Sequence, residues 1–122
     1  MGVINVTPNS FSDGGMWADP EVAIRHARDL VVEGADIIDV GGESTRPGAE
    51  RTPEDEELRR VLPVVKALVA DGVTVSVDTM RASVAKAVVG AGTSIINDVS
   101  GGKAEPEILD VAADAGVDYV LM

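Results

Sequence analysis

A glycine followed by a short apolar run recurs along the chain, and this repeat constrains the fold more than any other feature. It occurs at residues 34–39, 72–78, 92–98 and 116–120, and the first three runs end at a carboxylate or amide side chain. Glycine commonly ends a helix, because it adopts the left-handed backbone conformation without strain. Short, nearly continuous apolar runs are typical of parallel strands that are buried on both faces. We therefore expect each segment to be a turn that leads into a strand of a parallel sheet.

Helical patterns separate these strands. Apolar residues recur at three- and four-residue spacing over residues 20–33, which predicts a helix that ends at a glycine. Pro63 lies inside the second helical segment and predicts a kink or a break there. The acidic run 54–57 opens the same segment, where the helix dipole favours negative charge, and we interpret this run as a solvated helix start. The single histidine, His26, is interpreted as structural. The expected helices are 20–33, 53–70, 81–91 and 106–115, and the expected strands are 2–6, 36–40, 73–77, 94–96 and 118–122.

The alternation of strands and helices predicts an α/β fold with a parallel sheet and crossover helices. A doubly wound sheet suits a chain of 122 residues, whereas a (β/α)8 TIM barrel needs about 250. The chain begins inside an apolar segment and stops inside another. We therefore favour a partial (β/α)8 TIM barrel of about four βα units plus a fifth strand. Residues 1–122 are then the N-terminal portion of a single barrel domain.

Composition excludes several classes of function. The net charge of −11 argues against a nucleic-acid or anionic-membrane surface. No run approaches the ~18 apolar residues of a membrane span, and nothing has the pattern of a signal peptide. The absence of cysteine excludes disulfides and thiolate chemistry. We expect a cytoplasmic protein without a nucleic-acid or membrane partner.

Polar side chains stand where the predicted strands end. In parallel α/β folds the active site lies at this edge of the sheet. Amides and carboxylates that converge there suit hydrogen bonding to a heterocycle with ring N–H and amino groups, or oxygen ligation of Mg²⁺. We expect two of the carboxylates, Asp39 and Asp98, to satisfy loop backbone rather than to act in catalysis. The strand-end residues are Asn5, Asp39, Asp78, Asn97 and Asp98.

Two of the predicted loops are long. Loops of about a dozen residues without secondary structure are uncommon unless they are functional. The loop 7–18 contains the only Phe and the only Trp of the chain, which suggests that it covers a ligand. The loop 41–51 offers hydroxyl groups, backbone N–H groups and Arg46, a combination that binds phosphate well.

Four segments resemble, in order, the signatures of the dihydropteroate synthase family. They are NVTPNSFSDGG at 5–15, DVGGESTRPG at 39–48, VDT at 77–79 and NDVSGG at 97–102. One departure is that family members often have Asp where Asn9 stands. Together the segments cover essentially the whole chain. The resemblance implies a TIM-barrel enzyme of folate biosynthesis that condenses 6-hydroxymethyl-7,8-dihydropterin diphosphate with p-aminobenzoate to give 7,8-dihydropteroate and diphosphate.

The resemblance also implies roles for individual residues. Asp78 and Asn97 would hydrogen-bond the pterin ring, and Asp78, as the candidate catalytic residue, would stabilise a developing cation on it. Asn5 would lie at Mg²⁺ and the diphosphate. Thr45 and Arg46 would lie at the substrate, and the loop residues Phe11 and Ser12 would close over p-aminobenzoate.

Complete family members have an acid, a lysine and an Arg-x-His segment on later strands, which these 122 residues lack. We therefore expect this chain to be inactive alone. We also expect the full-length protein to be a homodimer. Two other functions use the same strand ends: a pterin-binding paralogue without synthase activity, and a pterin-dependent methyltransferase domain. The long loops at 7–18 and 41–51 disfavour both, because a protein that only binds pterin needs no lid for an aminobenzoate.

Overall fold

The strands and helices alternate as the sequence predicts. The structure, a computed structural model, describes residues 2–6, 20–42, 53–98, 100 and 102–121, with the side chains of Asn5 and Leu121 outside the description. The elements are β1 (Gly2–Asn5), α1 (Pro20–Val32), β2 (Ile37–Gly41), α2 (Glu54–Ala70), β3 (Thr74–Asp78), α3 (Ala82–Gly90), β4 (Ile95–Asp98), α4 (Glu107–Ala115) and β5 (Asp118–Leu121).

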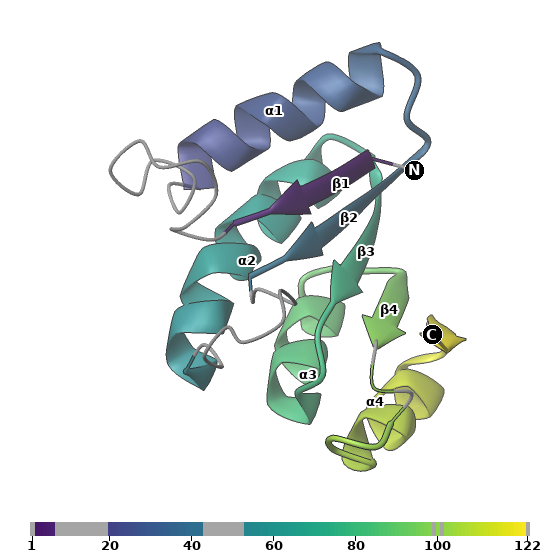
Figure 1. Cartoon of the computed structure of the whole chain (residues 1–122). Helices are drawn as coiled ribbons and strands as arrows, with labels where there is room; N and C mark the ends of the chain where they lie inside the picture. The colour runs from purple at the N-terminus through teal and green to yellow at the C-terminus, as the bar shows by residue number, and fades with distance from the viewer. Residues whose placement is uncertain (1, 7–19, 43–52, 99, 101, 122) are drawn as a thin grey trace.

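The five strands form one parallel sheet in the order β1-β2-β3-β4-β5. Each strand therefore lies beside the next one in the chain, and the strand order never reverses as it does in a doubly wound sheet. Consecutive helices contact one another, α1 with α2, α2 with α3 and α3 with α4, so they form a single layer against the sheet (Figure 1). This is the winding of a (β/α)8 barrel, and the expected partial barrel is confirmed.

The core lies between the sheet and the helix layer. Burying a Val, Leu or Ile side chain stabilises a fold by about 1.5–3 kcal/mol, so this layer of aliphatic side chains holds the helices on the sheet. Strand residues that face the helices are fully buried against helical Val, Leu and Ile side chains: Ile38, Val40, Val75, Val77 and Ile96 from the strands, and Val61, Val65, Leu68, Val84, Val88 and Ile108 from the helices.

The opposite face of the sheet carries the polar residues. Side chains alternate between the two faces of a strand, and residues paired in a parallel register share a face. The register gives one row nearest the carboxyl ends of the strands, which we call the inner row, and a second row below it. The inner row is Asn5, Gly41, Asp78, Asn97 and Val120, and the lower row is Val3, Asp39, Ser76, Ile95 and Asp118. Val3 and Val120 are 53% and 40% exposed, as expected where no described helix covers this face.

The repeat glycines have the predicted backbone. Gly34, Gly72, Gly92 and Gly116 have φ angles of 113°, 81°, 111° and 69°. Gly92 is required for a second reason, because a Cβ atom there would lie 2.7 Å from Cγ1 of Val69. The turn after α3 thus needs glycine both for its conformation and for its close approach to α2.

Two predictions about the elements need correction. The predicted break at Pro63 is wrong, because the helix α2 runs continuously through this residue, although proline removes one backbone donor there. The strand β2 ends at Gly41 rather than at Val40, so Asp39 lies within the strand and not at its end.

The single histidine, His26, is exposed on α1. No helix in the described part of the chain is long and apolar enough to cross a membrane.

Candidate active site at the carboxyl ends of the strands

Asp78 and Asn97 lie side by side in the inner row. They are paired in the register of β3 and β4, and neighbouring strands are about 4.8 Å apart. Both residues are half-buried. The backbone N–H of Thr79 donates a hydrogen bond of 3.2 Å to the carbonyl oxygen of Asn97, which extends the pairing of the two strands past their last ladder residues. The structure therefore brings together the two residues that the sequence predicts at a pterin ring.

The side-chain oxygen of Asn97 is a buried acceptor that nothing in the described part of the chain satisfies. A buried polar atom without a hydrogen bond costs about 1–3 kcal/mol. Such atoms in a folded protein call for an explanation, and one explanation is a ligand that supplies the missing donor. The Oδ1 atom of Asn97 could therefore accept a hydrogen bond from an N–H or O–H group of a ligand bound at the inner row.

Asp39 lies one row below this pair. Its carboxylate is buried and accepts a hydrogen bond of 2.7 Å from Oγ of Ser76. The prediction that Asp39 stands at a strand end is therefore wrong, and so is the expectation that it satisfies loop backbone, since its described partner is a neighbouring side chain. The cause is the length of β2, which continues for two residues past Asp39.

Asp98 organises the turn that follows β4. Its buried carboxylate accepts hydrogen bonds from the N–H and Oγ of Ser100 at 2.9 and 2.7 Å, from the N–H of Gly102 at 2.9 Å and from the hydroxyl of Tyr119 at 2.8 Å. Burial of this carboxyl raises its pKa, but these hydrogen bonds outweigh burial and leave the pKa below its ordinary value. The expectation that Asp98 satisfies loop backbone is confirmed.

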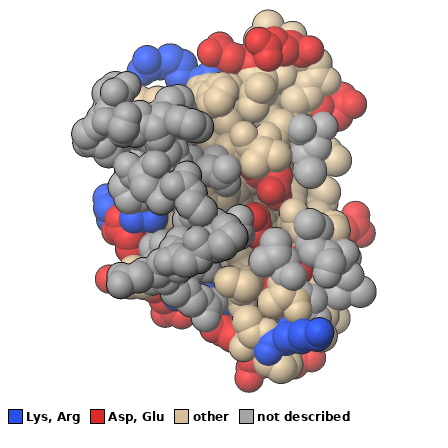
Figure 2. All heavy atoms as spheres, in the orientation of Figure 1, with Lys and Arg blue, Asp and Glu red and all other residues tan. Residues whose placement is uncertain are grey.

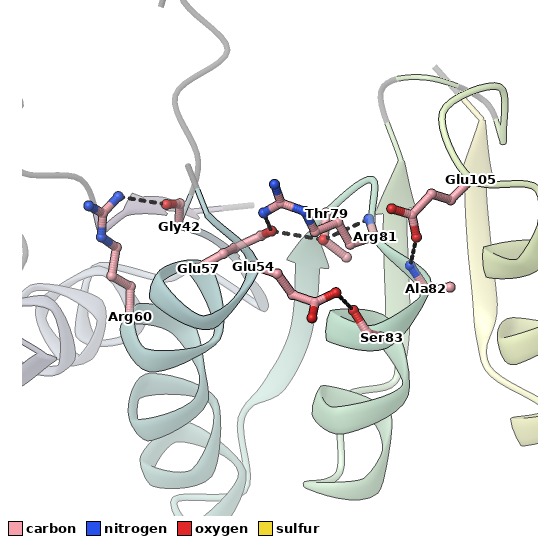
Figure 3. A network of polar contacts seen from close by, with 9 residues as sticks. All are labelled: Gly42, Glu54, Glu57, Arg60, Thr79, Arg81, Ala82, Ser83 and Glu105. Atoms are coloured by element: carbon pink, nitrogen blue, oxygen red, sulfur yellow. Dashed lines mark hydrogen bonds and ion pairs between the residues drawn. The ribbon is translucent and has the colours of Figure 1, made fainter. Parts of the chain in front are cut away.

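A buried polar network lies between α2 and the start of α3 (Figure 3). Glu57 is 0% exposed and accepts hydrogen bonds of 2.8 Å from Oγ1 of Thr79 and from Nη1 of Arg81. The interpretation of residues 54–57 as a solvated helix start is therefore wrong for Glu57. One signal in the sequence indicated this: Glu57 stands four residues before Val61 and seven before Val64, on the apolar face of the helix.

The same end of α2 also contacts the end of β2. Nη1 of Arg60 donates a hydrogen bond of 3.0 Å to the carbonyl oxygen of Gly42, and Nε of Arg60 lies 3.2 Å from Oε1 of Glu56. Gly42 itself is pressed against the helix, because a Cβ atom there would lie 2.9 Å from Cγ1 of Val61 and 3.0 Å from the carbonyl oxygen of Glu57. Gly42, the last described residue before residue 53, is thus fixed by α2.

Several predicted site residues lie outside the described residues: Phe11, Ser12, Thr45 and Arg46. Their predicted roles remain predictions. For Asn5 the structure describes the backbone, which pairs with Gly41 in the inner row, but not the side chain.

The described residues do not build a metal site by themselves. Among the side chains that the structure describes, no group of three or more His, Cys, Asp or Glu residues could hold a metal ion. Asn5 could offer one neutral oxygen. A magnesium ion at the inner row would therefore need most of its octahedral set of oxygen ligands from a bound substrate and water.

Acidic and basic side chains both occur on the face that Figure 2 shows. Figure 2 shows, among the described residues, blue basic side chains at the upper left, the left edge and the lower right of this face, and red acidic side chains at several places on it.

Comparison with known proteins agrees with this geometry. The family model described as "Pterin binding enzyme" matches residues 1–122. The chain is 58% identical to the dihydropteroate synthase of Mycobacterium leprae and 54% identical to that of Bacillus subtilis, over 100% of this chain and 43% of each relative. A structure of Xanthomonas albilineans dihydropteroate synthase with 4-aminobenzoic acid superposes with a TM-score of 0.92 at 52% identity, over 100% of this chain and 45% of that one. The chain thus spans less than half the length of the relatives it matches.

Proposed function

Because this chain belongs to the family of pterin binding enzymes, we propose that it forms the N-terminal portion of a dihydropteroate synthase barrel. The proposed reaction joins 6-hydroxymethyl-7,8-dihydropterin diphosphate to p-aminobenzoate. The bond between the pterin methylene carbon and the diphosphate oxygen breaks, a bond from that carbon to the arylamine nitrogen forms, and the amine releases a proton. The products are 7,8-dihydropteroate and diphosphate.

The observation that carries the proposal is the pair of acceptors in the inner row. Asn97 has a buried side-chain oxygen without a partner among the described residues, and the carboxylate of Asp78 stands on the adjacent strand. A pterin ring presents N–H and amino donors along one edge, and these donors match two acceptors held one strand apart. A site that hydrogen-bonds such donors rejects analogues that lack them, since its buried acceptor, Oδ1 of Asn97, would then stay unpaired.

Asp78 supplies the charge that the chemistry needs. Loss of diphosphate leaves positive charge on the pterin methylene, and a fixed carboxylate beside the ring stabilises that charge without reorganisation during the reaction. Asp78 is half-buried, so water screens its charge less than it would screen a surface carboxylate. Thr45 and Arg46 are proposed at the substrate, and Phe11 and Ser12 are proposed to close over p-aminobenzoate.

Mg²⁺ is proposed as the cofactor, with Asn5 as its ligand from this part of the chain. Since one amide does not hold this ion, the diphosphate and water would complete the coordination, and affinity for the ion should appear only with the diphosphate substrate. When bound, the ion would neutralise charge on the leaving diphosphate. Calorimetric titration with Mg²⁺, with and without pterin diphosphate, tests this. Equal affinity in both titrations would contradict the proposal.

The full-length protein is further proposed to be a cytoplasmic homodimer. Sedimentation at micromolar concentration tests the oligomeric state, and a monomer there would rule out the dimer. Fractionation of the source cells tests the location, and recovery with the membrane fraction would rule out the cytoplasm.

Substitution of Asp78 in the full-length protein tests the main proposal. Asp78→Asn keeps the shape and removes the charge, and we expect formation of dihydropteroate to fall by about 100-fold or more, as when one electrostatic group is removed from an active site. Glu33→Gln, an exposed acid after α1, is the matched control for loss of one negative charge. Wild-type turnover by Asp78→Asn would refute the assignment.

Calorimetry separates the synthase from the two other pterin proteins. A synthase should bind p-aminobenzoate in the presence of pterin and diphosphate. A pterin-binding paralogue or a pterin-dependent methyltransferase should bind the pterin without forming a ternary complex with the arylamine.

A further inference from the structure

The network of Glu57, Thr79 and Arg81 lies directly behind the inner row, on the helix side of the sheet. We propose that Glu57 and Thr79 are positioning residues, which act through the backbone of β3 and β4 to hold Asp78 and Asn97 at the separation that a pterin ring requires. The inference rests on the proposed function, because that function gives Asp78 and Asn97 their ligand.

Thr79 joins the two strands to the helix. It follows Asp78 in the chain, and its backbone N–H donates to the carbonyl oxygen of Asn97 at 3.2 Å. Its hydroxyl donates to Oε2 of Glu57 at 2.8 Å and accepts from the backbone N–H of Arg81 at 3.2 Å. One buried residue therefore bonds the strand of Asn97, the helix α2 and the first residues before α3. Its position decides where the carboxyl ends of β3 and β4 lie relative to each other.

Glu57 fixes Thr79 from the helix side. Its carboxylate is fully buried and is held at two oxygens by two donors, Thr79 and Arg81. A buried ion pair adds little stability compared with apolar side chains of the same size, because removing two charges from water costs about as much as their attraction returns. Stability alone therefore does not account for an acid on this face of α2. Directional hydrogen bonds do account for it, since Val or Leu in its place could not orient a hydroxyl group.

Two hydroxyl groups donate hydrogen bonds to acids of α2, and only one of them belongs to a residue next to Asp78 in the chain. Glu54 accepts a hydrogen bond from the hydroxyl of Ser83, which also joins α2 to α3, but this contact is exposed and involves no residue next to Asp78 or Asn97. Figure 3 shows both contacts in one view, with the Glu57 network nearer to the end of β3. Ser83→Ala thus offers a control that removes a hydroxyl contact to α2 without touching Thr79.

The experiment compares Thr79→Val, Thr79→Ser and Ser83→Ala in the full-length protein. Thr79→Val keeps the shape and removes the hydroxyl, and we expect its affinity for pterin diphosphate, measured by calorimetry, to fall by about tenfold or more, since a buried bond is lost. Thr79→Ser restores the hydroxyl and should recover affinity to within about threefold of wild type. Ser83→Ala should bind as the wild type does. In steady-state kinetics Thr79→Val should raise KM for the pterin substrate more than it lowers kcat.

A second readout does not depend on the ligand. In the ligand-free protein, the NMR resonances of the Asn97 side-chain amide should move in Thr79→Val and stay in place in Ser83→Ala. If the wild type binds no pterin but these resonances move, the proposed function fails and the positioning inference stands. A folded Thr79→Val variant with unchanged affinity and unchanged Asn97 resonances overturns the inference. Should Thr79→Val not fold, Glu57→Gln, which weakens the hold on the hydroxyl, is judged by the same two readouts.

Discussion

The hydroxyl of Tyr119 on β5 donates a hydrogen bond of 2.8 Å to the buried carboxylate of Asp98 at the end of β4. This bond is formed on the helix side of the sheet, one residue away from Asn97 in the inner row. The other donors to Asp98 come from Ser100 and Gly102 in the turn that follows. Asp98 therefore ties three segments together: the end of β4, its following turn and the next strand. Such a residue adds to stability through hydrogen bonds within the chain.

The pair predicts how stability depends on pH at both extremes. The pKa of Asp98 is lowered in the folded protein, so its contribution to stability is present above the unfolded pKa of about 3.9 and is lost as pH falls through the folded value. Burial first, and then the hydrogen bond and charge of Asp98, raise the pKa of Tyr119 to about 12. Its contribution is therefore present below the unfolded pKa of about 10 and is lost between about pH 10 and 12.

Replacing Tyr119 with Phe tests the alkaline limit. Since the ring stays and the hydroxyl goes, the variant should lose about 1–2 kcal/mol in unfolding free energy at pH 7. It should also lose the part of the decline between pH 10 and 12 that ionisation of Tyr119 causes. Urea unfolding of the full-length protein from pH 3 to 12 measures both effects. A variant whose alkaline decline matches that of the wild type would show that the Asp98 bond does not control this titration.

Arg60 and Arg59 form a matched pair that tests the contact between α2 and Gly42. Both bond Glu56, but only Arg60 reaches the carbonyl oxygen of Gly42, and it is buried whereas Arg59 is exposed. Arg60→Met should cost about 1–3 kcal/mol, because a buried carbonyl group loses its donor. Arg59→Met should change stability by no more than about 0.5 kcal/mol. Urea unfolding decides, and equal losses in the two variants would mean that the Gly42 bond contributes nothing.

The sequence correctly placed Asp78 and Asn97 together at one edge of the sheet, but it did not reveal the residues that support them. Asp78 and Asn97 could be placed because each follows an apolar run, and the carboxyl ends of parallel strands meet at one edge. Asp39 was misplaced, because an apolar run followed by glycine does not show at which residue the hydrogen-bonded ladder stops. Glu57 was missed, because the composition of one helix turn does not reveal that Thr79 and Arg81, more than 20 residues later, supply its partners. Such partners follow from tertiary packing.

Gly92 and Gly34 separate two costs of replacing a glycine. Their φ angles are nearly equal, 111° and 113°, but a Cβ atom at Gly92 would lie 2.7 Å from Val69, whereas nothing lies within 4 Å at Gly34. Gly34→Ala should therefore cost only backbone strain, about 1–2 kcal/mol. Gly92→Ala should cost that strain plus about 1–3 kcal/mol of overpacking. Thermal unfolding of the two variants in the full-length protein measures the difference. A Gly92→Ala variant as stable as Gly34→Ala would show that Val69 moves aside freely.

Asn97→Leu should separate stability from ligand binding. Leucine has nearly the shape of asparagine and removes the buried Oδ1 atom, which has no partner among the described residues. Because an unpaired buried acceptor costs about 1–3 kcal/mol, its removal should leave the unfolding free energy of the ligand-free protein equal to that of the wild type or up to about 1 kcal/mol higher. The same change removes the acceptor proposed for the pterin, so affinity for pterin diphosphate should fall by about 100-fold, as for a site that loses a specific hydrogen bond.

Asn97→Ala is the control, since it removes the same oxygen but leaves a cavity and should lose stability as well as affinity. Urea unfolding and calorimetry on the same samples give both quantities. If Asn97→Leu were clearly destabilised, the oxygen would have a partner in the folded protein, and if it bound pterin like the wild type, Asn97 would lie outside the site.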